Sequence, residues 1–402
     1  MNRPPFELAD VVRRFGPACE AAYGATLTPA QRQAMRAIAK CRTAVLGGHV
    51  EACDGCGHRR IAYNSCRNRH CPKCQALARV EWLDRQAEDL LPVEYFHVVF
   101  TLPNAVGPLA LQNPRRVYAA LFRAAAESLA ELAADPKHLG AAIGFLMVLH
   151  TWGQTLTLHP HVHCVVPGGG LTPEGGWKSC RSGFFLPVKP LSRLFRGKFL
   201  AVLAGLHAKG LLTTEGQLDN WSDPTIFARW LADLRRTDWV VYAKPPFGGP
   251  EQVLKYLARY THRVAISNHR LVTLDDQTVS FRWKDYAQDN APKTMTLDGI
   301  EFLRRFLQHV LPSGFVRIRH FGFLANRGRE AQLARCRAAL QVEAAQSPNL
   351  ADLPVVTVVP DRDPREESRA CPACGLGRMV IVEVIPRSIH RPPVVGTATD
   401  SS

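Results

Sequence analysis

The 402-residue sequence has no apolar run that approaches the ~18 residues needed for a membrane-spanning helix. Its N-terminus, MNRPPFELADVV, also lacks the basic-then-apolar pattern of a secretory signal peptide. Acidic residues are scarce relative to basic ones, 35 against 50, which leaves a formal net charge of +15. We therefore expect a cytoplasmic protein with no membrane partner, whose positive field attracts polyanions. Nucleic acid is the first partner to consider, and a merely basic soluble protein is the alternative.

Several catalytic motifs are missing as well. The HExxH motif does not occur, and no acidic residue follows at the HxHxDH spacing of some metal hydrolases. The stretch GLTPEGGWKS fails as a nucleotide-binding loop because Gly176 occupies the position of the phosphate-binding lysine. We therefore expect no ATP partner, so any strand breakage must conserve its bond energy by another route.

Hydrophobic spacing predicts an α+β protein. Thr28, Pro29 and Gln31 supply the N-cap, first helical residue and capping box of a helix in TPAQRQAMRAIAKC. Two later apolar runs, AAIGFLMVLHTWG and HVHCVVPGGG, are close enough to pair as antiparallel strands, and HRLVTLDDQTVSFRWKDY has the pattern of a hairpin. Strands joined too closely for crossover helices favour an antiparallel sheet. We expect three parts: 1–92, which contains most of the clustered cysteines, 93–330, and a basic, partly disordered tail at 331–402.

Cysteines are clustered rather than scattered. In a reducing compartment, paired CxxC motifs indicate a metal site rather than disulfides. Cys53 and Cys56 are followed fourteen residues later by Cys71 and Cys74, a spacing that predicts one structural Zn²⁺ held by these four thiolates. A redox or incidental cysteine cluster is the alternative.

Other residues of this segment leave the ligand set open. Cys66 and His70 are alternative ligands, and a second metal is also compatible with the sequence. A phosphate-binding surface is expected from the basic residues threaded through the segment: Arg59, Arg60, Arg67, Arg69 and Lys73. The C-terminal CPAC, Cys371 and Cys374, is only half a site and fits two unliganded cysteines equally well.

Three histidines alternate in LTLHPHVHCVV. Residues two apart share one face of a strand, so His161 and His163 point together and can hold one divalent metal. Pro160 interrupts strand pairing, which makes His159 the outsider of the three. Surface histidines on a half-exposed strand are the alternative.

Two tyrosines stand four residues apart in EQVLKYLARYTHR, so the hydroxyls of Tyr256 and Tyr260 project from one helix face. Cations surround them, and nearby positive charge helps a phenol act as a nucleophile. Packing in a core stripe is the alternative. A second basic segment, FLRRFLQHVLPSGFVRIRHFGFLANRGR, supplies candidate DNA contacts, with an ordinary solvated face as the alternative: Arg304, Arg305, Arg317, Arg319, Arg327 and Arg329.

Together, the segments CDGCGHRRIAYNSCRNRHCPKCQ, HVVFTLP, HPHVHCVVPGGG and YLARYTHRVAISNHR resemble the rolling-circle transposases of the IS91 family, in this order over residues 10–330. The resemblance implies an antiparallel ferredoxin-like HUH nuclease sheet with flanking helices, preceded by a helical zinc-binding domain. It implies that His161 and His163 are the metal pair of a two-tyrosine transposase and that Tyr256 and Tyr260 are its nucleophiles.

The implied reaction nicks and rejoins single-stranded DNA at hairpin-bearing element ends through a 5′-phosphotyrosine, with Mg²⁺ or Mn²⁺. Histidines alone are soft ligands for Mg²⁺, so we expect a carboxylate or amide as third ligand, with Gln154 and His97 as weak candidates. A zinc-dependent nucleic-acid-binding protein without catalysis and a metal-dependent nuclease that uses water remain alternatives.

Overall fold

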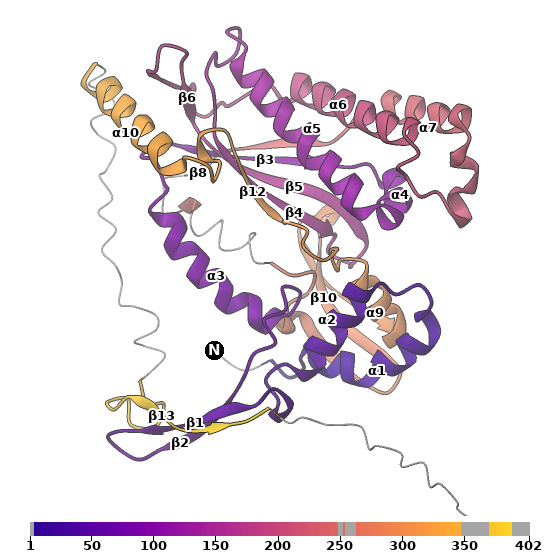
Figure 1. Ribbon diagram of the computed structural model, residues 1–402, viewed down its shortest axis with the longest axis vertical. Helices are drawn as coiled ribbons and strands as arrows, with labels where there is room; N and C mark the ends of the chain where they lie inside the picture. The colour runs from indigo at the N-terminus through magenta and orange to yellow at the C-terminus, as the bar shows by residue number, and fades with distance from the viewer. Residues whose placement is uncertain (1–3, 248–251, 254–262, 347–369, 388–402) are drawn as a thin grey trace, which may run out of the picture.

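The largest sheet has five antiparallel strands in the order β12-β4-β5-β3-β8 (Figure 1). The computed structural model describes residues 4–247, 252–253, 263–346 and 370–387. The strands are β3 (Tyr95–Thr101), β4 (Phe145–Trp152), β5 (Leu158–Pro167), β8 (Val241–Phe247) and β12 (Ile318–Phe321). Helices combined with antiparallel strands confirm the α+β expectation.

One face of this sheet is covered by helices and forms the main hydrophobic core (Figure 1). Alternate residues of β5, among them Val162, Cys164 and Val166, point into this core, as the strand pattern predicted. The covering helices are α4 (Gly107–Gln112), α5 (Pro114–Ala134), α6 (Val188–Ala208) and α7 (Pro224–Arg236).

The opposite face carries the histidines and a smaller apolar cluster. Trp82, on α3 (Pro72–Ala87), and Val253 pack there against sheet residues that include Tyr95 and Val165. Val253 is fully buried, so the chain just before the tyrosine-bearing stretch is fixed against this face.

The N-terminal helices pack on a later part of the chain. Helices α1 (Leu8–Tyr23), α2 (Pro29–Lys40) and α9 (Gly299–Leu307) share one core with a sheet of order β11-β10-β9. Its strands are β9 (Leu271–Leu274), β10 (Thr278–Asp285) and β11 (Ala291–Asp298), so the expected hairpin is confirmed and gains a third strand. The division at residue 92 stays a prediction, but this core draws on both sides of it.

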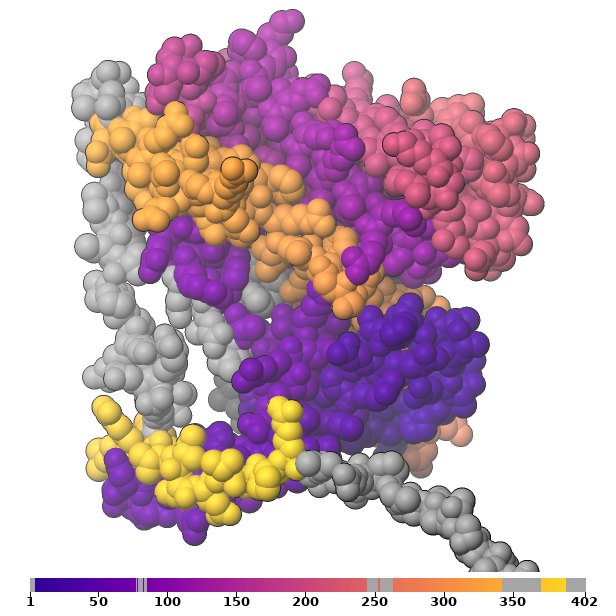
Figure 2. All heavy atoms as spheres, in the orientation of Figure 1, coloured from indigo at the N-terminus to yellow at the C-terminus, as the bar shows by residue number. Residues whose placement is uncertain are grey.

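A third sheet joins the two ends of the chain in the order β13-β1-β2. Strands β1 (Gly48–Cys53) and β2 (Arg59–Tyr63) form a hairpin, and β13 (Met379–Ile385) pairs antiparallel with β1. Figure 2 shows the C-terminal segment, in yellow, lying along the hairpin. The described parts of the tail are therefore integrated into the fold.

Two smaller features complete the description. Helix α10 (Arg329–Gln346) packs near the short strands β6 (Gly169–Leu171) and β7 (Trp177–Ser179). Among the helices of the described ranges, none combines the length and apolarity needed to cross a membrane.

Candidate metal centres and nucleic-acid-binding residues

Three histidines converge on the face of the five-stranded sheet that the main core leaves open. His161 and His163 lie two residues apart on β5, and His150 on β4 pairs directly opposite His161. Their candidate ligand nitrogens all lie within 4.8 Å of one another. Three imidazoles at this separation can share one divalent ion, and cross-strand pairing on one face is what brings them together.

Neighbouring groups orient two of these rings. Nδ1 of His161 lies 2.7 Å from the carbonyl oxygen of His159, so it carries the proton and donates it. Nδ1 of His163 lies 2.9 Å from Nε2 of His97. Both contacts engage Nδ1 and leave Nε2 as the nitrogen for a metal, which is how outer partners commonly orient metal-binding histidines.

Burial favours the neutral form of the two β5 histidines. It lowers the pKa of His161 to about 4, opposed by the hydrogen bond that His161 donates to the His159 carbonyl oxygen. Burial, followed by the charges of neighbouring histidines, also holds the pKa of His163 well below its ordinary value. Neutral imidazole is the form that binds metal, so the pair is ready for a metal at neutral pH.

Neither weak candidate for the third metal ligand, Gln154 or His97, lies in the histidine cluster. Gln154 instead donates a hydrogen bond from Nε2 to the hydroxyl of Tyr286, at 2.6 Å, and His97 supports His163 from behind. His150 completes the cluster, which contains no carboxylate in the described ranges. The sequence did hold a signal for His150, which is the one histidine of AAIGFLMVLHTWG, the run expected to pair with the histidine-rich strand. Because imidazole donors suit Mn²⁺ better than the oxygen-seeking Mg²⁺, the set fits Mn²⁺ better.

The two tyrosines singled out from the sequence, Tyr256 and Tyr260, lie outside the described residues. The nearest described residue before the tyrosines is Val253 and the nearest after them is Arg263, and both lie close to the histidine face of the sheet. Val253 packs in its apolar cluster, and the charge of Arg263 is close enough to lower the pKa of His161 and His163. Arg317 donates a hydrogen bond to the Arg263 carbonyl oxygen at 2.9 Å, which fixes the position of the Arg263 backbone.

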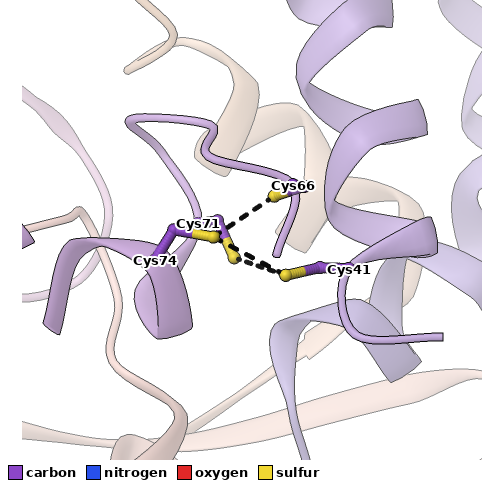
Figure 3. A group of neighbouring side chains, drawn as sticks. All are labelled: Cys41, Cys66, Cys71 and Cys74. Carbon is purple, nitrogen blue, oxygen red and sulfur yellow. Dashed lines mark hydrogen bonds between the residues drawn. The ribbon is translucent and has the colours of Figure 1, made fainter. Parts of the chain in front are cut away.

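Four cysteines gather beside the N-terminal helices (Figure 3). Cys41 caps the end of α2, Cys66 follows β2, and Cys71 and Cys74 begin α3. The sulfur of Cys41 lies 3.6 Å from those of Cys71 and Cys74, and the Cys66 sulfur lies 3.5 Å from that of Cys74. With Zn–S bonds of ~2.3 Å, a tetrahedral site has sulfur–sulfur edges of ~3.8 Å. The donor set therefore fits zinc.

The four ligands expected from spacing are not brought together. Cys53 and Cys56 lie at the turn of the β1–β2 hairpin and cluster with Cys371 and Cys374. The five residues of β2 carry the chain back from that turn, and at ~3.3 Å per residue they span ~16 Å. Cys71 and Cys74 are thus held at the opposite end of the hairpin, with Cys66 as the third ligand candidate. Cys41 lies before the CxxC region, where the spacing argument did not look.

His70 is not part of either cysteine cluster, because its Nε2 accepts a hydrogen bond from the Leu311 backbone at 3.4 Å. The basic residues of this segment also divide. Arg69 points inward and donates to backbone carbonyls that include Phe315, while Lys73 pairs with Glu7 and Arg60 with Glu51. Arg59 and Arg67 are exposed.

Most of the six candidate DNA-contact arginines have internal partners. Arg304 and Arg305 both pair with Glu301, and Arg329 pairs with Asp89. Arg317 holds the Arg263 carbonyl, and Arg319 stacks over Phe122 at 4.2 Å from the ring centre. Arg327 is exposed and forms no ion pair with any described residue. Their roles in DNA binding stay predictions, and Arg327 is the most available of the set.

A basic groove that the sequence did not reveal lies on the zinc-binding region. It has a volume of about 820 Å³, and it is lined by cations from three separate segments but by no acidic residue: Arg36, Lys40, Arg67 and Arg387. Such a groove suits a chain of phosphates.

Two family models match the chain. One, whose description reads "Putative transposase", covers residues 144–331, which include the histidine cluster. The other, "Transposase zinc-binding domain", covers residues 11–102 and thus contains Cys41, Cys66, Cys71 and Cys74. No solved structure matches.

Two curated relatives extend over nearly the whole chain. "Putative transposase y4qJ" of Sinorhizobium fredii is 55% identical over 392 residues, which is 96% of each chain. "Transposase for insertion sequence element IS801" of Pseudomonas savastanoi pv. phaseolicola is 31% identical, over 86% of this chain and 82% of its own. The chain therefore belongs to the IS91 family of transposases, with a zinc-binding domain followed by the transposase region that carries the histidine cluster.

Proposed function

We propose that this transposase nicks and rejoins single-stranded DNA at the ends of an insertion sequence through a 5′-phosphotyrosine intermediate, in rolling-circle transposition. The observation that carries the proposal is the cluster of His150, His161 and His163 on the face against which Val253 packs. Such a reaction requires a metal close to the nucleophilic tyrosines, and Val253, which precedes Tyr256 by three residues, lies on this face.

The sheet would act as an HUH nuclease sheet of the ferredoxin-like type, with the histidine pair on its central strand. Support comes from the antiparallel order β12-β4-β5-β3-β8, which makes β5 the middle strand, and from the helices on its other face. A central strand is held by partners on both sides, so its side chains are positioned more rigidly than those of an edge strand.

The residues in and around the histidine cluster have separate roles in the proposed reaction. His150, His161 and His163 would hold Mn²⁺ or Mg²⁺, which, when bound, polarises the scissile phosphate. His97 and the His159 carbonyl fix the ring orientations, because each engages Nδ1. Arg263 would supply a fixed positive charge close to the phosphate, where negative charge increases during attack.

Tyr256 and Tyr260 are the proposed nucleophiles. The phenolic oxygen of one tyrosine loses its proton and attacks phosphorus, and the P–O3′ bond breaks so that the 3′ oxygen leaves and takes up a proton. The new P–O bond to tyrosine keeps the energy of the broken bond, so the reverse attack by a 3′ hydroxyl rejoins DNA without ATP. Two tyrosines would allow one to hold a 5′ end while the other processes the next.

The basic groove is the proposed contact for the DNA backbone, including the hairpins at element ends. Arg36, Lys40, Arg67 and Arg387 supply cations without a competing carboxylate among the residues that line it. Arg327 is a further contact from the second basic segment. Such contacts bind phosphates without reading the sequence, and they make affinity dependent on salt.

Denaturing gels after incubation with 3′-end-labelled single-stranded DNA and Mn²⁺ test the proposal. The wild-type protein should form a labelled adduct that survives denaturation, and the Tyr256→Phe/Tyr260→Phe double variant should form none. Tyr63→Phe, which alters an exposed tyrosine on β2, is the matched control and should keep the adduct.

The same gel separates the alternatives. Cleavage that leaves only free 5′ phosphates would favour a nuclease that uses water. Binding without cleavage, under conditions where the metal is shown to be bound, would favour a zinc-dependent DNA-binding protein.

A further inference from the structure

A second cysteine cluster joins residues from the two ends of the chain. Cys56 and Cys371, 315 positions apart, have their sulfurs 3.6 Å from one another. Cys53 and Cys374 are 321 positions apart, with a sulfur–sulfur distance of 3.8 Å. All four sulfurs lie within 4.8 Å of one another. These separations are close to the ~3.8 Å edges of a tetrahedral zinc site and far longer than the ~2.05 Å of a disulfide.

The two CxxC motifs fold in the same way. In CDGCG, the backbone N–H groups of Gly55 and Cys56 point to the Cys53 sulfur, each at 3.4 Å. In CPACG, Ala373 N–H points to the Cys371 sulfur, and Gly377 N–H to that of Cys374, again at 3.4 Å. Donors aimed at sulfur stabilise thiolates, which are the form that binds metal.

A glycine with positive φ closes each turn. Gly57 has φ 69° and Gly375 has φ 70°, and each donates its N–H to the carbonyl of the first cysteine of its motif. The third CxxC, at Cys71 and Cys74, is followed by glutamine and continues into α3. The glycine after the second cysteine therefore distinguishes the two motifs that pair with each other.

The sheet that holds this cluster has almost no core of its own. Its buried apolar residues are two of the cysteines and Met379, with Cys374 partly buried against them. Several larger apolar side chains of β13 are exposed, including Ile381 and Val384. A unit that buries so little apolar surface needs another source of folding free energy, and a structural metal commonly provides it.

We propose that Cys53, Cys56, Cys371 and Cys374 hold a second structural Zn²⁺, which ties the C-terminal strand β13 to the β1–β2 hairpin. This site is separate from the Cys41 cluster, and half of it lies far beyond residues 11–102, which match the zinc-binding domain. Because β13 ends at Ile385, the tie also delivers Arg387 to the basic groove.

Zinc content of the purified full-length protein tests the proposal. Wild type should contain two Zn²⁺ per chain, whereas Cys53→Ser, Cys371→Ser and the double variant should each contain one, since all remove the same ion. Cys180→Ser, outside both clusters, should keep two. Additive losses in the double variant, or a Cys371→Ser protein that keeps two Zn²⁺, would overturn the shared site.

A second measurement uses the wild-type protein and does not depend on the variants folding. Alkylation followed by mass spectrometry should find Cys53, Cys56, Cys371 and Cys374 protected together, and a chelator should expose all four. If Cys371 and Cys374 react at the rate of unprotected thiols while Cys53 and Cys56 are protected, the proposal is wrong. A disulfide between the two motifs in the purified protein would also refute it.

Discussion

Lowering the pH from about 7.5 to about 5.5 tests whether the histidine cluster is as buried as its surroundings indicate. An imidazole with the ordinary pKa of ~6.5 is only ~9% neutral at pH 5.5, so two together are neutral in under ~1% of molecules. A metal that needs both would then bind about a hundredfold more weakly. With its pKa at about 4, His161 stays almost wholly neutral at pH 5.5, and burial shifts the pKa of His163 in the same direction.

We therefore expect the affinity for Mn²⁺ to fall by far less than a hundredfold over this range. Isothermal titration calorimetry with the wild-type protein measures it, with the zinc sites filled beforehand. His161→Ala and His150→Ala should abolish the Mn²⁺ signal, while His138→Ala, which alters an exposed histidine, should not.

Circular dichroism at each pH controls for unfolding. A hundredfold loss of Mn²⁺ affinity by a protein that is still folded at pH 5.5 would refute the argument, because it would mean that protons compete at the ordinary pKa. Unchanged Mn²⁺ binding by His150→Ala would instead remove His150 from the ligand set.

Four further outcomes are expected. Cys41→Ser should lose one Zn²⁺ per chain and become cleavable by protease near α1 and α2, as measured by metal analysis and limited proteolysis. Burial lowers the pKa of His309 to about 4, below its unfolded value of ~6.5. The stability that depends on neutral His309 is therefore complete above pH 6.5 and is lost as the pH falls toward 4. Denaturant titrations should show that acid lowers the free energy of unfolding by about 3 kcal/mol less in His309→Gln than in wild type. Arg387→Gln should weaken binding to unrelated DNA sequences alike and reduce the slope of log affinity against log salt by about 0.7, measured by fluorescence anisotropy. A Cβ at Gly299 would lie 2.4 Å from the Phe15 ring, so Gly299→Ala should destabilise the protein by about 1–3 kcal/mol in thermal unfolding. Gly197 in α6 has open space around it, so Gly197→Ala should stabilise the protein by about 0.5–1 kcal/mol.

Local rules predicted local structure well. The capping box of Thr28 and Gln31 forms at the start of α2, and the turn at 275–277 closes the hairpin of β9 and β10. Such features depend on residues within a few positions of each other, so the sequence contains all the information they need. The shared face of His161 and His163 follows from strand periodicity in the same way.

Contacts between distant segments were harder to predict. His150 meets His161 only in one register of the β4–β5 pair, and that register ends at His150, because an irregularity shifts the pairing before Trp152. The cysteine ligands were misassigned for a related reason: spacing favours nearby partners, yet closing a long loop costs little more than closing a short one. Cys53 therefore pairs across most of the chain, while the nearer Cys71 joins Cys41.

The pairing of β1 with β13 also bears on how the protein is made. At ~5–20 residues per second, ribosomes need roughly 16–64 s to extend a chain from Cys53 to Cys374, which are 321 positions apart. Throughout this time the two cysteines of the hairpin turn lack their two C-terminal partners, and β1 has an open edge. A chain whose synthesis stops before Cys371 can still complete the Cys41 cluster and the strands that carry the histidines, but it cannot complete the terminal sheet. Assembly of that sheet thus depends on translation having reached the last part of the message, and it distinguishes a finished transposase from a truncated one.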